Sequence, residues 1–423
     1  MNLQQVNGVR DQLLTMFSIA LSAVDGQQST HAFISRISIA TTNVRVIAIG
    51  KAASAMMQGA SLALGDKLRS GLVITKPGHG LTDFDKRITT LESDHPVPSA
   101  RSLDAGERLL EFVKQVNSDE LLLVLISGGT SSLVEVLDET VTLEQLIKLN
   151  NWCLANPFSI SQINALRQCI SKIKAGRLIN YINTGHIIQL TISDVQGNDL
   201  SVIGSGLLVD DMRLKNEDVS VLGVQQSPAW LVSLIRNCSR NRNEAYVTSH
   251  NNIIEIQQHI IADNQTARDA ILTYAQQQEL SIHQNQEIYL EVTLAAEQIA
   301  KTIVNGEPGV YVWGGECVVA LPDNPGQGGR CQSLALAIAE YIKGMNIVML
   351  VAGTDGSDGP GEAAGALIDG LTIQRGEELG LSAAAELERA NAGYYLSETG
   401  DLIDTGPTNT NVMDLIIALK HPD

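Results

Sequence analysis

The feature that most constrains the fold is a short apolar run that recurs along the chain and ends each time in a turn of small or polar residues. The runs cover residues 44–49, 121–126, 187–192, 309–313 and 347–352. Because polar residues do not alternate within them, they indicate strands buried on both faces, as in parallel sheets covered by helices. Helical periodicity follows several of the turns. The pattern predicts an α/β fold whose turns line the carboxyl edges of the sheets, where ligands bind in such folds.

The length of the chain predicts more than one domain. With 423 residues it is two to three times the size of a typical domain. Residues 236–286 are rich in Asn and Gln and contain no strand–glycine–helix junction before residue 289. We therefore place a boundary near residue 235, with one domain over residues 1–235 and a second over residues 236–423.

Composition excludes several classes of partner. Acidic residues outnumber basic ones by 47 to 29, so the protein repels nucleic-acid phosphates and acidic lipid surfaces. The five cysteines are scattered and never in CxxC spacing, which favours reduced thiols and a cytoplasmic protein over a disulfide framework or a zinc site. The apolar runs are too short to span a membrane. Residues 1–24 are typical of an amphipathic helix rather than a signal peptide.

A lysine and a run of small residues suggest an anion site. Lys51 follows Gly50 where the first strand should end, and a lysine at the start of a helix opposes the helix dipole unless an anion compensates. An exposed lysine without a ligand explains its position equally well. The second run is followed by the small residues Ser127, Gly128, Gly129, Thr130 and Ser131. Their successive N–H groups could hold a phosphate or carboxylate, although an ordinary strand-to-helix turn has the same composition.

Two common nucleotide motifs are missing. The chain has no GxxxxGK[ST] sequence, which argues against a P-loop NTPase. It also has no GxGxxG between a strand and a helix, since residues 326–329 are too compressed, so a nicotinamide-binding Rossmann site loses its main support.

One segment has an unusual charge. The 49 residues from 145 to 193 contain no Asp or Glu but five Lys or Arg. Residues 164–178 are typical of a helix with a basic face, and we expect Arg167 and Lys174 to bind an anion there. The alternative is a solvated basic helix that balances an acidic protein.

Aspartates and an arginine complete the candidate chemistry. Asp355, with Asp358 nearby, lies in a glycine loop after a strand, and Asp194 with Asp199 repeats this pattern in the first half. Such carboxylates suit Mg²⁺, although turn-forming Asp beside Gly is the simpler explanation for either loop alone. Arg330 follows two glycines, so its guanidinium could reach an anion in bidentate fashion. Together with Lys51 and the glycine turn, these loops favour phosphoryl transfer.

In this order, the motifs resemble the class II glycerate 2-kinase family, whose C-terminal part is the MOFRL domain. The resemblance covers nearly the whole chain. It rests on IGKAASAM (49–56), ESDHPVPSARSLDAGERLL (92–110), LISGGTSSL (125–133), INALRQCISKIKAGRL (163–178), SDVQGNDLSVIGSG (193–206), GGRCQSLALA (328–337), AGTDGSDGPGEAAGA (352–366) and TGPTNTNVMDL (405–415).

The resemblance implies a cytoplasmic enzyme of hydroxy-acid metabolism that uses ATP and Mg²⁺ to phosphorylate the 2-hydroxyl of D-glycerate. It implies two α/β domains with mainly parallel sheets, a Rossmann-like N-terminal domain and a smaller MOFRL-type C-terminal domain, with the active site in the cleft between them. The family's functional lysine falls on Lys51, its arginine on Arg330, and its two aspartates on Asp194 and Asp355. The expected partners are ATP and a small acid, and a homodimer is compatible with the resemblance.

Departures from the family pattern leave the acceptor open. The chain has Leu207 where the family has proline, and Cys331 and Ser333 where it has asparagine and glutamate. Residues next to Arg330 could therefore shape the pocket for another small hydroxy-acid. Many family members are labelled hydroxypyruvate reductases, so an NAD(P)H-dependent reductase is a second hypothesis. A catalytically silent paralogue that binds a ligand is a third.

Overall fold

The computed structural model describes residues 3–81, 84–154, 156, 160–209, 228–245 and 255–422. The chain forms two compact units. The first, the central unit, is Gly26–Ile261. The second, the terminal unit, combines Met1–Asp25 with Ala262–Asp423. The expected site in a cleft between the two domains stays a prediction.

A six-stranded sheet forms the centre of the central unit. Its order is β3 (Ile88–Glu92), β2 (Leu68–Thr75), β1 (Val44–Ile49), β4 (Leu121–Ile126), β5 (His186–Ile192) and β6 (Glu255–Ala262). The pairs from β3 to β5 are all parallel, with β1 between β2 and β4. Every residue of β1 and β4 is buried, as the continuous apolar runs predicted. The Rossmann-like expectation is therefore confirmed for this unit.

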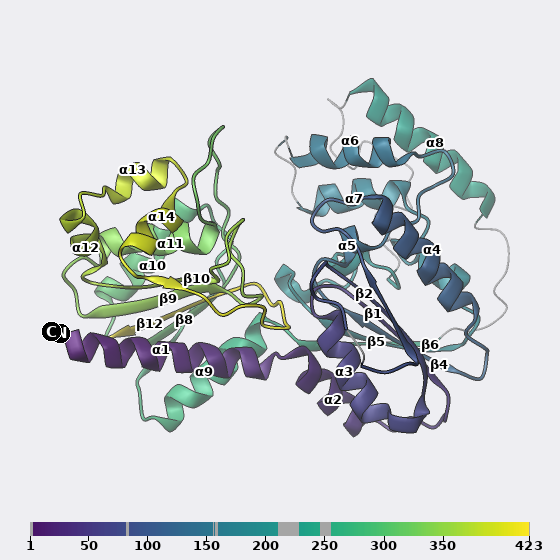
Figure 1. Cartoon of the computed structure of the whole chain (residues 1–423), viewed down its shortest axis with the longest axis horizontal. Coiled ribbons are helices and arrows are strands. Elements are labelled where there is room, and N and C mark those ends of the chain that lie inside the picture. The colour runs from purple at the N-terminus through teal and green to yellow at the C-terminus, as the bar shows by residue number, and fades with distance from the viewer. Residues whose placement is uncertain are drawn as a thin grey trace. The chain divides into compact units, whose positions relative to one another are not determined.

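Helices cover both faces of this sheet. Figure 1 shows α2 and α3 on one side and α4, α5 and α7 on the other. The helices of this unit are α2 (Gly26–Arg36), α3 (Ala53–Leu64), α4 (Ala100–Lys114), α5 (Thr130–Leu133), α6 (Leu143–Leu154), α7 (Ile160–Ile170) and α8 (Ala229–Ala245). Ile47 and Ile49 share a core with Leu109 of α4. Because side chains alternate along a strand, Val46 and Ala48 are buried on the opposite face.

The terminal unit has a second six-stranded sheet, with a different strand pattern. Its order is β11 (Leu402–Ile403), β10 (Gly365–Asp369), β9 (Ile347–Gly353), β12 (Asp414–Lys420), β8 (Gly309–Gly315) and β7 (Ile282–Gln284). Only β7 and β8 pair in parallel, and the other four pairs are antiparallel. The prediction of mainly parallel sheets is therefore wrong here. Continuous apolar runs report burial on both faces, and helices supply that burial whatever the strand direction.

Helices cover both faces of the second sheet as well. They are α1 (Leu3–Ala23), α9 (Asn264–Gln277), α10 (Val292–Asn305), α11 (Arg330–Tyr341), α12 (Thr372–Glu378), α13 (Ala383–Glu388) and α14 (Ala392–Glu398). Figure 1 shows α1 and α9 on one side of β8, β9 and β12, and α10 to α14 on the other. Short 3-10 helices, all in the central unit, cover Gly65–Lys67, Arg177–Tyr181, Gln196–Asn198 and Ile203–Ser205.

The first helix of the chain belongs to the terminal unit. Helix α1 is amphipathic, as predicted, and buries side chains such as Val9, Leu13 and Met16 at helical spacing. It contacts α9, β9 and β12. The two units thus differ from the predicted domains in two ways. Residues 1–25 belong with the C-terminal part of the chain, and the central unit continues beyond the predicted boundary at residue 235. The central unit continues to residue 261 because α8 packs on α7 and β6 completes the first sheet.

An ionic cluster ties α1 to the second sheet. Arg10 donates to Asp369 at 2.9 Å and to Asp401 at 3.0 Å, and Arg375 binds the same two carboxylates. Both aspartate side chains are at most 2% exposed. Two cations therefore balance two buried anions inside this unit.

Removing one cation from this cluster should destabilise the terminal unit. We expect Arg375→Ala to lower the free energy of unfolding by about 3 kcal/mol, because it leaves buried carboxylate charge only partly compensated. Urea unfolding followed by circular dichroism measures the change. Arg389→Ala, which removes an exposed partner of Glu386, is the matched control and should cost less than about 1 kcal/mol. Equal effects of the two substitutions would contradict a stabilising role for the cluster.

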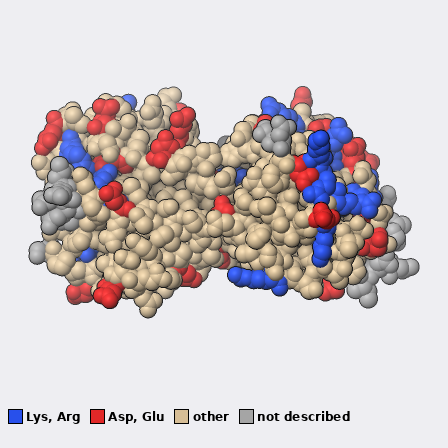
Figure 2. Space-filling view, turned by 60° about the horizontal axis from the view of Figure 1, so that its bottom comes forward, with Lys and Arg blue, Asp and Glu red and all other residues tan. Residues whose placement is uncertain are grey.

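Charge is divided unequally between the units. The terminal unit contains 8 basic and 25 acidic residues, whereas the central unit contains 21 and 22. Figure 2 shows a band of Lys and Arg side chains on the nearly neutral central unit. An anion therefore meets far less electrostatic repulsion from the central unit. Within the described part of the chain, no helix has the length and apolarity that crossing a membrane requires.

Candidate functional site

Three of the predicted loops of the central unit follow strands that end at one edge of its sheet. Lys51 follows β1, residues 127–131 follow β4, and Asp194 follows β5. These strands are adjacent and parallel, in the order β1, β4, β5. Their carboxyl ends therefore meet at the same edge, and the loops that carry these residues start side by side.

The loops after β1 and β4 are locked together by backbone contacts. Gly50 has a φ of +128°, and a Cβ atom at this position would lie 2.2 Å from the hydroxyl oxygen of Ser127. The N–H of Lys51 donates to the carbonyl of Gly128 at 2.9 Å, and the N–H of Ala52 donates to the Ser127 hydroxyl at 3.1 Å. Gly50 and Ser127 thus fix the geometry of the two loops. The Ser127 hydroxyl and the N–H groups of Lys51 and Ala52 are already hydrogen-bonded within the protein.

The four residues after Ser127 carry backbone N–H groups that the described part of the protein does not use. Among the residues that the structure describes, the N–H groups of Gly128, Gly129, Thr130 and Ser131 have no hydrogen-bond acceptor. Gly129 adopts a φ of +88°, which brings successive N–H groups around a common centre. The Thr130 hydroxyl donates to the carbonyls of Ile49 and Ser127 and thereby fixes the turn. We call residues 128–131 the glycine turn.

Lys51 and a histidine flank the glycine turn. A Cβ atom on Gly129 would lie 3.4 Å from Cγ of Lys51 and 3.2 Å from Nε2 of His95. Both side chains are partly exposed. His95 follows β3, which is separated from β4 by two strands, so only the fold brings it here. His95 lies in the motif SDHPVP, and its position in the sequence does not predict this contact.

Lys174 corrects the expected basic surface. Its side chain is 1% exposed, forms an ion pair with Glu135 and donates to the Ser131 carbonyl at 2.8 Å. Burial lowers the pKa of Lys174, and the charge of Glu135 opposes that shift. The prediction that Lys174 binds a ligand at the surface is therefore wrong. The buried pair supports the glycine turn through the hydrogen bond from Lys174 to the Ser131 carbonyl. The ammonium of Lys174 also compensates the negative charge of Glu135.

Arg167 is also engaged within the protein. Helix α7 ends at Ile170, so residues 164–178 are not one helix as predicted. The Nε–H of Arg167 donates to the Asn150 side chain at 2.7 Å. Burial lowers the pKa of Arg167, and nearby Cys153 and Glu135 oppose this. The acid-free segment thus packs against α6 and the glycine turn instead of forming one exposed basic face.

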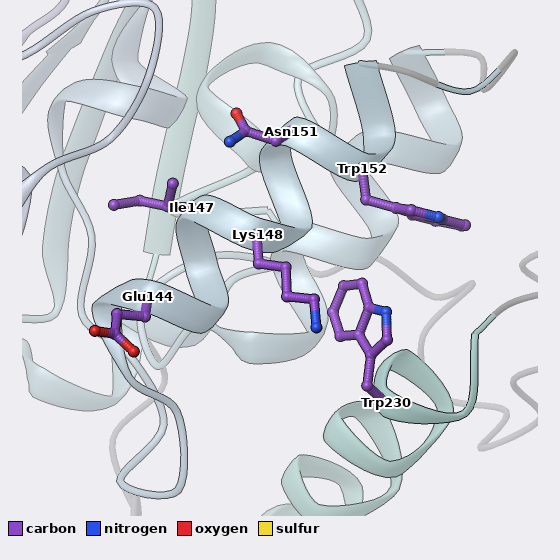
Figure 3. A pocket seen from close by; sticks show the side chains of 6 residues that line it. All are labelled: Glu144, Ile147, Lys148, Asn151, Trp152 and Trp230. Carbon is purple, nitrogen blue, oxygen red and sulfur yellow. The ribbon is translucent and has the colours of Figure 1, made fainter.

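A pocket of about 570 Å³ opens elsewhere on the central unit. It is lined by Glu144, Ile147, Lys148, Asn151, Trp152 and Trp230. Figure 3 shows the ammonium of Lys148 directed at the ring of Trp230, and its Nζ lies 4.4 Å from the ring centroid. None of the predicted site residues lines this pocket, so we do not include it in the candidate site.

The aspartates of the loop after β5 differ in what they do. Asp199 accepts hydrogen bonds from the N–H and hydroxyl of Ser201 at 2.9 and 2.6 Å, which is the turn-forming role that the simpler explanation predicted. Asp194 is partly exposed and lies directly after β5, next to Ser193. It remains the candidate acidic residue at this edge.

In the terminal unit, Arg330 already binds two carboxylates. Its Nε and Nη2 donate to the two oxygens of Asp414 at 2.7 and 2.9 Å, and its Nη1 lies 2.7 Å from Glu316. Burial lowers the pKa of Arg330, but the hydrogen bonds and charge of Asp414 outweigh it and raise the pKa. The predicted bidentate contact exists, but its partner is a residue of this chain.

Asp355 lies close to this arginine cluster. A Cβ atom on Gly353 would lie 3.5 Å from an oxygen of Asp355 and 3.5 Å from one of Asp414. Asp355 accepts hydrogen bonds from the N–H and hydroxyl of Ser357 at 3.1 and 3.0 Å. The fold therefore brings Asp355 and Arg330 together through Asp414. Asp414 and Glu316 were not predicted, although Asp414 lies within the motif TGPTNTNVMDL and Glu316 directly follows β8.

Asp358 has a structural role. Its carboxylate accepts hydrogen bonds from the N–H groups of Cys331 and Gln332 at 3.0 and 2.8 Å, which caps the start of α11. Burial raises its pKa to about 6, although these hydrogen bonds oppose the shift. By fixing the first turn of α11, Asp358 also fixes the position of Arg330.

Two family models match the chain. Residues 12–229 match a domain of unknown function, DUF4147, and residues 309–414 match the MOFRL family. The first model covers more than half of the chain and includes the central-unit loops. The second includes Arg330, Asp355 and Asp414.

Several known proteins are similar along most of their length. The D-glycerate 2-kinase of Thermotoga maritima is 33% identical over 89% of this chain and 90% of its own. The glycerate 2-kinase of Pyrococcus horikoshii is 31% identical, over 89% and 87%. A protein of Agrobacterium vitis provisionally named a hydroxypyruvate reductase is 32% identical, over 88% and 97%. The crystal structure of Thermotoga maritima glycerate kinase matches with a TM-score of 0.84 and 29% identity, over 98% of this chain and 100% of that one.

Sequence motifs, family models and full-length relatives agree with the fold. The chain belongs to the glycerate 2-kinase family with a MOFRL domain.

Proposed function

We propose that this protein is a kinase that transfers the γ-phosphoryl group of ATP to the 2-hydroxyl of D-glycerate, giving 2-phosphoglycerate and ADP. The observation that carries the proposal is the glycine turn. Four successive N–H groups without acceptors among the described residues lie beside Lys51 at the carboxyl edge of a parallel sheet. Family membership supplies the reaction class.

The central unit suits the phosphates of the donor. Backbone N–H groups bind phosphate oxygens without selecting a sequence, and a lysine adds a compact positive charge. Because phosphoryl transfer needs little covalent help, positioning and charge stabilisation carry most of its rate. We assign the phosphates to the glycine turn and Lys51. The nearly balanced charge of this unit is favourable for an anionic nucleotide.

The terminal unit suits the acid. Nη1 of Arg330 contacts the partly exposed Glu316, whereas Nε and Nη2 are held by Asp414. We assign the carboxylate of the acceptor to the Nη1 side. Attack of the 2-hydroxyl oxygen on the γ-phosphorus then breaks the bond to the β,γ-bridging oxygen of ATP, and the hydroxyl proton leaves to a base.

Magnesium is compatible with the residues present. No cluster of three or more His, Cys, Asp or Glu side chains suited to a metal occurs within the described ranges. Mg²⁺ bound to a nucleotide needs only one or two protein carboxylates, because phosphates and water complete its shell. Asp194 and Asp355 are the carboxylates that we propose for the metal or for the acceptor hydroxyl. When bound, the metal would neutralise charge on the phosphates.

Substituting these aspartates should test their roles. We expect Asp355→Asn and Asp194→Asn each to lower kcat by at least about a hundredfold, the usual scale for a group that moves a proton or holds the metal. Titration with Mg²⁺ distinguishes the two roles, since a metal ligand should raise the Mg²⁺ concentration needed for half-maximal rate. Asp323→Asn, at an exposed position of the terminal unit, is the control. Activity within twofold of the unsubstituted enzyme would remove the residue from the site.

The proposed activity is tested by two coupled assays. Purified protein with ATP, Mg²⁺ and D-glycerate should release ADP, and NADH with hydroxypyruvate should not be oxidised. The reverse result would favour the reductase hypothesis. No turnover in either assay, with binding of ATP retained, would favour a ligand-binding paralogue.

We also propose that the enzyme works in the cytoplasm. None of the five cysteines, all of which the structure describes, forms a disulfide, and all five are buried, which fits a reducing compartment.

A further inference from the structure

The contacts of Arg330 are unequal in burial. Asp414 is 8% exposed and is bound to two donors of the guanidinium, whereas Glu316 is 43% exposed and reaches the remaining nitrogen, Nη1. Asp414 is also the first residue of β12, and its carbonyl accepts from the Asn264 side chain at 2.9 Å. Asp414 is therefore fixed by the sheet, whereas Glu316 follows the end of β8 and its side chain is partly exposed.

These burial differences decide which carboxylate an incoming anion can replace. A buried, doubly hydrogen-bonded carboxylate leaves its cation only at high cost, whereas an exposed ion pair contributes little and is readily exchanged. An external carboxylate that approaches Arg330 therefore competes with Glu316 and not with Asp414.

The surroundings also fix the charge that can be accommodated. The two negative charges of Glu316 and Asp414 outnumber the single positive charge of Arg330, and Asp355 lies near Asp414. The whole unit has 25 acidic residues against 8 basic ones. One carboxylate can take the place of Glu316 on Nη1, but a second negative charge on the same molecule would face the displaced Glu316 and the neighbouring acids.

We propose that Glu316 is a specificity-determining residue that competes with the acceptor carboxylate for Arg330 and restricts the site to small 2-hydroxy-acids with one carboxylate. This inference rests on the proposed function. It predicts that Glu316 weakens binding of D-glycerate and discriminates against tartronate, in which a second carboxylate replaces the hydroxymethyl group of glycerate.

The substitution Glu316→Gln tests this inference, because glutamine keeps the size of the side chain and removes its charge. We expect the KM for D-glycerate to fall severalfold, and the ratio of kcat/KM for tartronate to that for D-glycerate to rise about tenfold. Glu316→Asp should stay close to the unsubstituted enzyme in this ratio, because it keeps the charge. Glu388→Gln, at an exposed position of the same unit, removes the same charge and should leave the ratio unchanged.

A binding measurement separates this inference from the proposed function. Isothermal titration of D-glycerate and of tartronate without ATP reports affinity even if no phosphoryl group is transferred. Tighter binding of both acids by Glu316→Gln, with the larger gain for tartronate, would support the inference. If the unsubstituted protein transfers no phosphoryl group, the proposed function fails whatever these titrations show. If the kcat/KM ratio and the two affinities of Glu316→Gln stay within twofold of the unsubstituted protein, the proposed role of Glu316 is overturned. That result would leave the proposed function unaffected.

Discussion

Replacing Lys51 with alanine is expected to lower kcat/KM for ATP and D-glycerate by about a thousandfold while leaving the fold intact. Lys51 lies beside the glycine turn, and its Cγ is within van der Waals distance of the Cβ position of Gly129. Removing a fixed cation that faces developing negative charge typically costs this much in phosphoryl transfer. The backbone N–H of residue 51 would still donate to Gly128, so the loop should persist.

Initial rates with ATP and D-glycerate measure the effect, and circular dichroism measures the fold. Lys86→Ala removes an exposed lysine of the same unit and should leave the rates unchanged. If Lys51→Ala retains activity within a few-fold, the glycine turn does not hold the phosphates in the way proposed. Retained ATP affinity with a lost kcat would place the role of Lys51 in the transition state.

Replacing Arg330 should give an effect of similar size, and lysine should not restore activity. We expect Arg330→Ala to lower kcat/KM by about a thousandfold, and Arg330→Lys to remain at least a hundredfold below the unsubstituted enzyme. The guanidinium makes three contacts at once, two to Asp414 and one to Glu316. An ammonium cannot hold both oxygens of Asp414 in a fork and also present a donor on the Glu316 side.

The comparison between Arg330→Ala and Arg330→Lys decides whether the fork of the guanidinium is needed or only its charge. Both should raise the KM for the acid, and thermal unfolding should identify any loss of stability from leaving Asp414 unpaired. Arg389→Lys, at an exposed site of the same unit, is the control. Full activity of Arg330→Lys would mean that Arg330 contributes only a general positive charge.

Sequence reasoning predicts the edge of the first sheet well because its signals are local. Each buried strand appears as an apolar run, and each loop that carries Lys51, Gly128 or Asp194 follows one directly. Parallel pairing then brings the loops to one edge. The direction of the strands in the second sheet could not be obtained in this way, because burial on both faces leaves the same pattern in β9 and β12, which are antiparallel.

Contacts between distant residues are the part that sequence could not supply. Glu135 neutralises Lys174 from 39 positions away, and Asp414 holds Arg330 from 84 positions away. The basic residues therefore looked available for ligands although the fold had already paired them. The same limit explains why α1 was assigned to the first domain, since its partner helix α9 begins at residue 264.

The central claim is tested most directly by identifying the product. Purified protein should be incubated with ATP, Mg²⁺ and D-glycerate, and the phosphorus spectrum recorded with coupling to protons. Transfer to the 2-hydroxyl predicts a new resonance split into a doublet by the single proton on C2, with ADP formed in equal amount. A triplet, from phosphate on the CH₂ group at C3, or no new phosphate ester at all would contradict the account.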